Sequence, residues 1–442
     1  PASPVPQQWP TGRAYSEANK AAAVQPANAP AWGDFITDAR LREIIDTTLK
    51  NNRDLRISAL NVERAKAMYG IGQTSLLPTL SATGLWYKER IPADLAAGGS
   101  AYTAEKYSVN LGMSAWEIDF FGRIRSLKDA ALAEYLATDQ ARIGAQLMLT
   151  AAVSQAWLAL AADREALELA VKTLEAQELT YKLMHKRFDA GMASELDLRR
   201  VQSQVETARG DFARYTQLVA QDENALNLLA GSSIRSDLMP SGLTSVSPPR
   251  DIFPGLSSEL LLSRPDVMAA EHRLKAANAN IGAARAAFFP KITLTTSVGT
   301  ASAQLSGLFR PGSGVWAFSP QISMPIFDAR TWFAYSVAKI DKKITIAQYE
   351  KSIQTAFREV ADALAEKGMI NERVKAQEAL VEALSVAYRL SEARYNKGID
   401  SYLAVLDAQR SLYAARQGLI MLQLARINNT ITLYKALGGT NR

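Results

Sequence analysis

The stretch Arg187-Phe188-Asp189-Ala190-Gly191 returns 207 positions later as Arg394-Tyr395-Asn396-Lys397-Gly398. The match continues at the same offset, pairing Gln202 with Gln409, Ala208 with Ala415, Leu226 with Leu433 and Gly231 with Gly438. Upstream, at an offset of 212, Asp54, Gly70, Leu77-Pro78 and Leu80 match Asp266, Gly282, Phe289-Pro290 and Ile292. Self-similarity over such a long period is the signature of repeated structural units. We predict two repeats, residues 37–231 and 256–438, joined by a Ser/Pro/Gly-rich linker, residues 232–255, and followed by a short tail, residues 439–442.

Each repeat shows the same order of patterns, namely a helix, two strands and two long helices. The first helices are expected over residues 40–76 and 259–289, and each is closed by a proline that a continuing helix would not tolerate. Strands are expected at about 79–117 and 291–326, because apolar and small polar residues alternate there with period two. One side of these strands is compatible with lipid, although the strands alone also fit a soluble sandwich.

The helices that follow are longer than those of ordinary globular domains. Residues 124–189 and 331–396 contain no proline, and at ~1.5 Å per residue each would extend roughly 100 Å. Each is expected to form a hairpin, over about 124–231 and 331–438, with a second helix whose seam positions, most of them apolar, recur at steps of three and four. In the first hairpin these positions are Leu198, Val201, Val205, Ala208, Phe212, Tyr215, Val219, Asp222, Leu226 and Leu229. Such a heptad seam predicts left-handed coiled coils.

The composition of the 442 residues excludes several classes of protein. The chain has no Cys and only two His, so thiol nucleophiles, His-based triads and zinc fingers lack their residues. The net charge of +6 is dispersed and forms no basic run, which argues against nucleic-acid binding. The ten Met residues do not cluster and are interpreted as core fillers, and His185 as a surface residue. We therefore expect no enzyme, no cofactor and no metal site.

The expected helices show no sequence pattern typical of a membrane-spanning helix, which limits how the protein could cross a membrane. The longest uncharged stretch, residues 143–162, contains Gln146, Thr150, Ser154 and Gln155, and it is expected to be a buried helix rather than a membrane span. The first residues show no signal-peptide pattern, so the chain is expected to be mature or trimmed. A membrane protein without apolar spanning helices needs a closed β-barrel. Four strands cannot close one, two copies would give eight strands with a filled interior, and three copies give twelve strands with room for a lumen.

Several motifs together resemble the TolC-like outer-membrane factors, or outer-membrane efflux proteins, of the OprM, MtrE and CusC type. The most specific stretch is Ala277-Asn278-Ala279-Asn280-Ile281-Gly282-Ala283-Ala284-Arg285-Ala286-Ala287-Phe288-Phe289-Pro290. It is supported by Asn51-Asn52-Arg53-Asp54-Leu55-Arg56, Glu117-Ile118-Asp119-Phe120-Phe121-Gly122-Arg123, Leu261-Leu262-Ser263-Arg264-Pro265-Asp266 and Tyr434-Lys435-Ala436-Leu437-Gly438-Gly439. The resemblance covers nearly the whole chain.

This resemblance implies a mixed α and β membrane protein built as a homotrimer. Each protomer would give four strands to one 12-stranded transmembrane β-barrel, continued by a long periplasmic coiled-coil barrel, with residues 1–36 as an extended N-terminal segment of an equatorial collar. Residues 1–8 resemble sequence shortly after a lipid-modified Cys that begins many members, so the anchor is expected to have been trimmed.

The function implied is that of a passive export duct for small molecules such as drugs, in the outer membrane of a Gram-negative bacterium. Its partners would be a periplasmic membrane-fusion adaptor and an inner-membrane transporter of the RND type. Whether the cargo is a drug, a solvent or a metal ion is left open by the sequence. A soluble coiled-coil scaffold or adaptor is the alternative, since it would share the heptads without needing the strands.

A duct of this kind must be closed at rest, and the hairpin tips, residues 189–194 and 396–401, are the expected place. Gly191 and Gly398 would turn these tips and contact the adaptor. Just beyond the second tip, Leu403 and Asp407 lie at i and i+4, on one helical face. By resemblance they would line the periplasmic constriction as an apolar ring and an acidic ring, whereas without it Asp407 reads as an ordinary surface acid.

Three further residues are candidates for closing the tips. By resemblance, Tyr395 and Asp197 would link neighbouring coiled coils. Arg410, three residues after Asp407, would bond an acid on the adjacent helix. The alternative interpretation is that all three are ordinary solvent-exposed helix residues without a role in closure.

Overall fold

A computed structural model of the protein describes residues 4–15, 30–252 and 258–439. The chain divides into two compact units, and each unit takes segments from both repeats. The first comprises Pro1–Leu60, Gln140–Met268 and Glu350–Arg442. The second comprises Asn61–Asp139 and Ala269–Tyr349. Residues 16–29 of the expected N-terminal segment, 253–255 of the expected linker and 440–442 of the expected tail lie outside the described residues.

The single helix expected over residues 40–76 is wrong, because two helices, α3 (Ala39–Asn51) and α4 (Arg53–Thr74), meet at Asn52. Asn52 adopts an extended backbone conformation, with ψ at 130°. Its side chain accepts a hydrogen bond from the amide of Leu55 at 2.9 Å and donates one to the carbonyl of Leu229 at 2.8 Å. Asn52 therefore caps α4 and also bonds the end of a helix far away in the sequence, the one that contains Leu229.

The expected helix over residues 259–289 is also shorter than predicted. Residues Ser258–Ser263 form the 3-10 helix η4, and α7 (Pro265–Ala286) begins only afterwards. Proline is favoured at the first position of a helix because it has no N–H to leave unpaired there. Arg264, just before it, is buried and reaches Asp266 at 2.8 Å, Glu359 at 2.8 Å and the carbonyl of Ala436.

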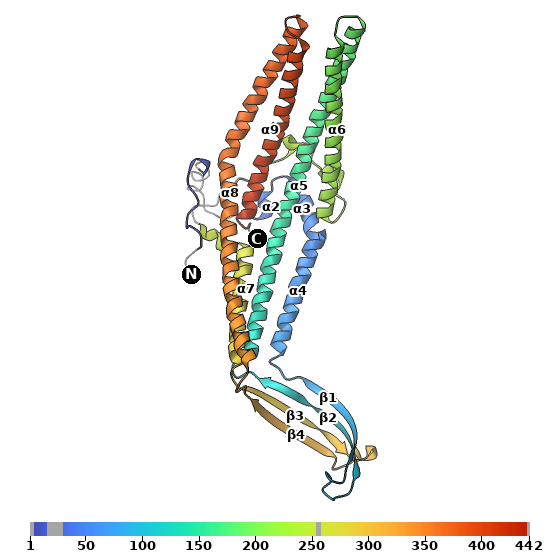
Figure 1. Cartoon of the computed structure of the whole chain (residues 1–442), viewed down its shortest axis with the longest axis vertical. Helices are drawn as coiled ribbons and strands as arrows, with labels where there is room; N and C mark the ends of the chain where they lie inside the picture. Colours follow the sequence, from blue (N-terminus) through green and yellow to red (C-terminus); the bar gives the residue numbers. More distant parts are fainter. Residues whose placement is uncertain (1–3, 16–29, 253–257, 440–442) are drawn as a thin grey trace. The chain divides into compact units, whose positions relative to one another are not determined.

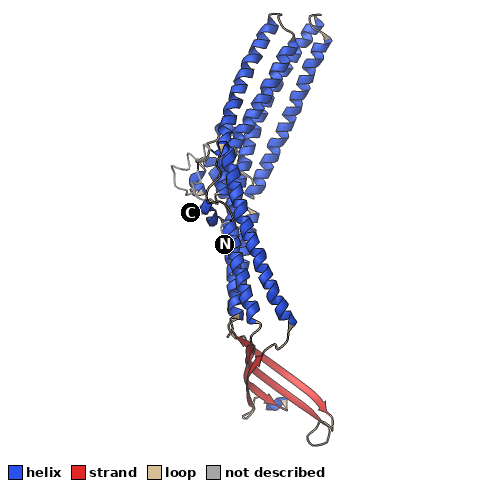
Figure 2. Ribbon diagram, turned by 60° about the vertical axis from the view of Figure 1, so that its left-hand side comes forward, coloured by secondary structure: helices blue, strands red, loops and turns tan. Residues whose placement is uncertain are grey.

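Four strands form one antiparallel sheet in the order β1 (Leu80–Ile91), β2 (Tyr102–Ile118), β3 (Lys291–Ser302) and β4 (Gly314–Ser323) (Figure 2). Cross-strand pairing places most of the large apolar residues of the four strands on one face: Leu80, Ala82, Trp86, Tyr107, Val109, Leu111, Met113, Leu294, Val298, Trp316, Phe318 and Ile322. The other face carries Ser81, Thr83, Ser108, Asn110, Thr293, Thr295, Ser297, Ser319 and Gln321. The expected alternation is clear in β2 and β3 and in most of β4, whereas β1 alternates less clearly, with Leu85 and Tyr87 on the polar face.

β2 and β3, the pair that joins the two repeats, approach each other closely at two glycines. A Cβ added to Gly112 or Gly299 would collide with the backbone of the facing strand, lying 2.7 Å from the Cα of Ser297 or of Asn110. Nearby, Ala115 has a positive φ of 50° at an irregularity in the register, and its amide donates to the Thr295 hydroxyl at 3.0 Å. Glycine at these two positions permits the close approach of the two strands.

Two helical hairpins complete the chain (Figure 1). The first pairs α5 (Arg123–Asp189) with α6 (Glu195–Ala230), and the second pairs α8 (Ala329–Asn396) with α9 (Tyr402–Ala436). Among the described residues, only α5 is long and apolar enough to cross a membrane by length and composition, and 39% of its most apolar window is buried. Within that helix Trp157 is fully buried and donates to the carbonyl of Leu238 in η2 (Ser236–Leu238) at 3.1 Å.

The described part of the N-terminal segment packs on the first unit. Trp9 is buried and stacks on Phe357 of α8, with ring centroids 5.2 Å apart. The carbonyl of Ala14, in η1 (Arg13–Tyr15), lies so close to Gly368 of α8 that a Cβ at Gly368 would collide with it. Further along, the short helix α2 (Trp32–Phe35) precedes α3, and its Phe35 stacks on Tyr434 at 4.1 Å.

Candidate functional site

The two hairpin tips turn the chain in the same way. Gly191 and Gly398 follow the ends of α5 and α8, and both have a φ of +73°. In each tip the amide just after the glycine donates to the carbonyl four residues before it, at 2.8 Å in the first tip and 3.0 Å in the second. A helix end of this type requires a left-handed residue, which explains the two glycines. The structure thus places both at the turns, whereas their contact with an adaptor stays a prediction.

Asp197 serves the start of α6. The hydroxyl of Ser194 accepts a hydrogen bond from the amide of Asp197 at 3.1 Å and donates one to its carboxylate at 2.6 Å. Arg200 lies 3.7 Å from the same carboxylate, one turn further along the helix. Ser194 is thus an N-cap that satisfies one orphan amide at the start of α6, and Asp197 fixes the orientation of its hydroxyl.

An apolar cluster joins the two tips within the first unit. Its buried members are Met184, Leu198 and Val201 of the first hairpin, and Tyr402, Val405 and Leu406 of the second. Tyr181, Ala193, Tyr388 and Tyr395 pack around it. Because burial of side chains of this size contributes roughly 1.5–3 kcal/mol each, the cluster is a substantial contact between the hairpins of one chain.

A polar contact accompanies this cluster. Arg187 of α5 donates to the hydroxyl of Tyr395 of α8 at 2.7 Å, and its guanidinium lies 5.5 Å from the centre of the same ring. Tyr395 in turn meets Tyr402 edge to face at 4.9 Å. Burial raises the pKa of Tyr402 to about 12, so its hydroxyl stays protonated. Within one chain Tyr395 is thus bonded to Arg187, and a link from Tyr395 to Asp197 in a neighbouring coil stays a prediction.

Leu403 and Asp407 face away from the tip cluster. Tyr402, Val405 and Leu406 are buried, whereas the side chain of Asp407 is 56% exposed and Leu403 is 41% exposed. Within the chain the guanidinium of Arg410 donates to Asp407 itself at 3.0 Å, and a bond from Arg410 to an acid on a neighbouring helix stays a prediction. The three residues form one exposed stripe on α9, at spacings of four and three. The chain therefore presents the predicted gate residues together on a face that its own described residues leave open.

Sequence reasoning named Tyr395 but missed Arg187 and the tyrosines Tyr388 and Tyr402, which pack with it at the tips. Tyr388 and Tyr395 lie seven residues apart, a spacing that could have marked them as one coiled-coil face. The partner Arg187 could not have been found in this way, since it comes from the other repeat.

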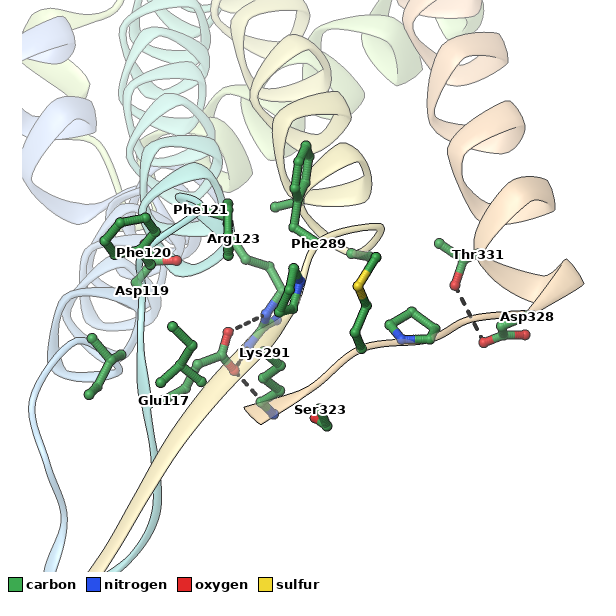
Figure 3. A pocket seen from close by; sticks show the side chains of 17 residues that line it. Glu117, Asp119, Phe120, Phe121, Arg123, Phe289, Lys291, Ser323, Asp328 and Thr331 are labelled. Atoms are coloured by element: carbon green, nitrogen blue, oxygen red, sulfur yellow. Dashed lines mark hydrogen bonds and ion pairs between the residues drawn. The ribbon is translucent and has the colours of Figure 1, made fainter. Parts of the chain in front are cut away.

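The strand-to-helix elbow explains another of the motifs found in the sequence. Glu117 at the end of β2 forms two hydrogen bonds with Arg123, at 2.7 and 2.8 Å, and an ion pair with Lys291 of β3 at 3.1 Å (Figure 3). Asp119 accepts hydrogen bonds from the first amides of α5, at 3.1 and 2.8 Å. These residues line a cavity of about 430 Å³ together with Phe121 and others. Because Glu117 bonds Arg123 and Asp119 caps the first amides of α5, the motif directs the chain from strand to helix.

Comparison with known proteins agrees with this architecture. The family model described as outer membrane efflux protein matches residues 44–232 and 256–439, which are the two repeats. The toluene efflux pump outer membrane protein TtgF of Pseudomonas putida is 47% identical, over 99% of this chain and 92% of its own length. The antibiotic efflux pump outer membrane protein ArpC of Pseudomonas putida is 45% identical, over 99% of this chain and 90% of its own length. A crystal structure of a membrane protein from Pseudomonas aeruginosa superposes with a TM-score of 0.91 at 42% identity, covering 99% of this chain and 96% of that one. The family model matches both repeats, and the relatives match the chain over nearly its whole length. The chain therefore belongs to the outer membrane efflux protein family.

Proposed function

We propose that three copies of this chain assemble into the outer-membrane duct of a tripartite efflux pump. The observation that carries the proposal is the sheet, which has one apolar face and two unpaired edges, β1 and β4. Unpaired backbone groups in lipid cost several kcal/mol each, so β4 of one copy must pair with β1 of the next until the ring closes. Three copies give twelve strands, whose polar faces would line a lumen.

A second feature supports contact between copies. On α8 the residues Phe333, Val337, Ile340 and Ile344 recur at steps of four, three and four, and they are 73%, 55%, 52% and 50% exposed. A stripe with this spacing fits a neighbouring helix as a coiled-coil seam. In the proposed trimer it is covered by the next protomer.

The particle mass tests the assembly. The detergent-purified protein, measured by sedimentation with a correction for bound detergent, should contain three chains of 48.1 kDa each. A stable monomer that keeps its strand signal in circular dichroism would contradict the proposal. A protein that leaves the membrane in a high-salt wash would favour the soluble scaffold instead.

The exposed stripe on α9 is the proposed gate. Around a threefold axis Leu403 would form an apolar ring and Asp407 an acidic ring, and a narrow apolar ring can exclude water and ions without charge. Arg410, 3.0 Å from Asp407, would partly neutralise the acidic ring. We expect the closed tips to open when a periplasmic adaptor contacts them and couples the duct to an inner-membrane transporter. The similarity to outer membrane proteins of a toluene efflux pump and of an antibiotic efflux pump supports small organic molecules as cargo.

Single-channel currents in planar bilayers test the gate. Leu403→Ala should mainly raise conductance, Asp407→Ala should weaken cation selectivity and block by divalent cations, and Arg410→Ala should strengthen both. Leu196→Ala is the matched control, because Leu196 is the counterpart of Leu403 in the first repeat. If the three variants carry the same currents as the parent, the constriction lies elsewhere.

A further inference from the structure

The seam of the first hairpin contains two acids that face each other. Asp163 lies on α5 and Asp222 on α6, and their carboxyl groups are within hydrogen-bonding reach. The Oδ2 atom of Asp222 is buried and finds no hydrogen-bond donor among the described residues. Two carboxylates are both acceptors, so this pair can form a hydrogen bond only when one of them carries a proton.

The second repeat shows how the same position is filled without a proton. At the offset of 207, Asp163 corresponds to Ile370 and Asp222 to Asn429. Asn429 is 3% exposed, and its amide donates to the carbonyl of Ala363 at 2.9 Å and to the carboxylate of Glu366 at 3.0 Å. An amide donates at any pH, whereas a carboxyl donates only when it is protonated. The two hairpins therefore differ in the one seam position where both are polar.

The neighbouring charges are already partnered. On the same two helices Arg164 pairs with Glu223 at 2.6 Å, and Glu165 accepts from the amide of Leu243 at 2.8 Å. On α3, which packs against α6, Arg40 pairs with Asp38 at 2.9 Å and Glu43 with Arg235 at 3.0 Å. Asp237 of η2 also binds Arg235, at 3.1 Å. Each of these charges in the described part of the chain thus has a partner other than Asp163 or Asp222, and a proton shared between the two acids can supply the missing donor.

We propose that Asp163 and Asp222 form a proton-operated clamp between α5 and α6, closed in acid and released near neutral pH. Burial, and after it the hydrogen bond to Asp163, raises the pKa of Asp222 to about 6. Because the pKa is raised in the closed seam, the clamp stabilises the seam fully at low pH and loses its effect as the pH rises through about 6. Above that pH two negative charges face each other inside the coiled coil and favour separation of the helices.

The size of the effect follows from linkage. If Asp222 regains an ordinary value near 3.8 when the seam separates, opening of the seam at pH 8 should exceed that at pH 5 about tenfold. The second hairpin should show no such change at its counterpart positions. At neutral pH α5 and α6 of the first hairpin would therefore separate more often, while the second hairpin would be unchanged.

Hydrogen exchange of the full-length protein in detergent tests the clamp. Amides of α5 and α6 around residues 160–166 and 219–226 should exchange about tenfold faster at pH 8 than at pH 5, after correction for intrinsic exchange rates. The matching segments of the second hairpin, residues 367–373 and 426–433, serve as an internal reference. Asp222→Asn and Asp163→Asn should each abolish the excess, since an amide donates to the remaining carboxylate at either pH.

The transfer of the pair supplies a gain-of-function test. Ile370→Asp combined with Asn429→Asp should create the same pH dependence in the second hairpin. Equal pH dependence in the parent and in both single asparagine variants would overturn the proposal. So would a double variant that folds and exchanges without pH dependence in the second hairpin.

Discussion

The assignment of the apolar face can be tested with two neighbouring residues of β4. Phe318 lies on the apolar face opposite Thr296, and Ser319 lies on the polar face opposite Thr295. Both are exposed and sit at the middle of a ten-residue strand. We compare Phe318→Arg with Ser319→Arg, which place the same side chain at the same depth but on opposite faces.

The expected magnitude follows from the position in the strand. At ~3.3 Å per residue, Phe318 lies about 13 Å from the strand end at Gly314 and about 17 Å from the end at Ser323, near the centre of an apolar band about 25 Å tall. An arginine facing lipid at that depth costs about 2–4 kcal/mol per chain, and three chains give about 6–12 kcal/mol per particle. Ser319→Arg points into the proposed lumen, where the arginine remains hydrated, so its cost should be close to zero.

Folding into phospholipid vesicles, followed as a function of urea concentration, measures both free energies. Phe318→Arg should lower the urea midpoint or prevent insertion, while Ser319→Arg should remain near the parent. Equal losses for the two variants would refute the two-faced sheet, and a larger loss for Ser319→Arg would invert its orientation.

Two glycine substitutions test close approaches of the backbone. Gly299→Ala should destabilise the folded protein by about 1–3 kcal/mol, because its new methyl group meets the backbone of β2, whereas Gly84→Ala, which has open space around it, should be neutral in the same urea titration. Gly368→Ala should displace the N-terminal segment from α8, so trypsin should cut at Arg13 faster than in the parent, even though alanine favours the helix by up to about 1 kcal/mol; an unchanged cleavage rate would contradict this contact.

Periodicity and repetition sufficed to predict the sheet, the long hairpins and the turns at Gly191 and Gly398, because these features depend on local patterns. The break at Asn52 escaped prediction, since it depends on the carbonyl of Leu229, far away in the sequence. The partners of Tyr395 and Arg410 escaped for related reasons. Arg187 comes from the other repeat, so no local pattern pairs it with Tyr395. Arg410 bonds Asp407 in its own helix, and sequence spacing alone does not decide between this bond and one to a neighbouring helix.

The close approach of β2 and β3 at Gly112 and Gly299 also bears on how the duplicated chain evolved. Six copies of a single-repeat ancestor would have met through six equivalent strand junctions, each free to exchange with the others. Gly112 and Gly299 now mark the β2 and β3 junction within the chain, while the counterpart of Gly299 in the first repeat, at the offset of 212, is Tyr87. The two halves have therefore ceased to be interchangeable modules. In the proposed trimer the three junctions within chains would carry this glycine pair, whereas β1 at the three junctions between chains carries Tyr87 in place of Gly299, so an ancestral sixfold symmetry would be reduced to a threefold one.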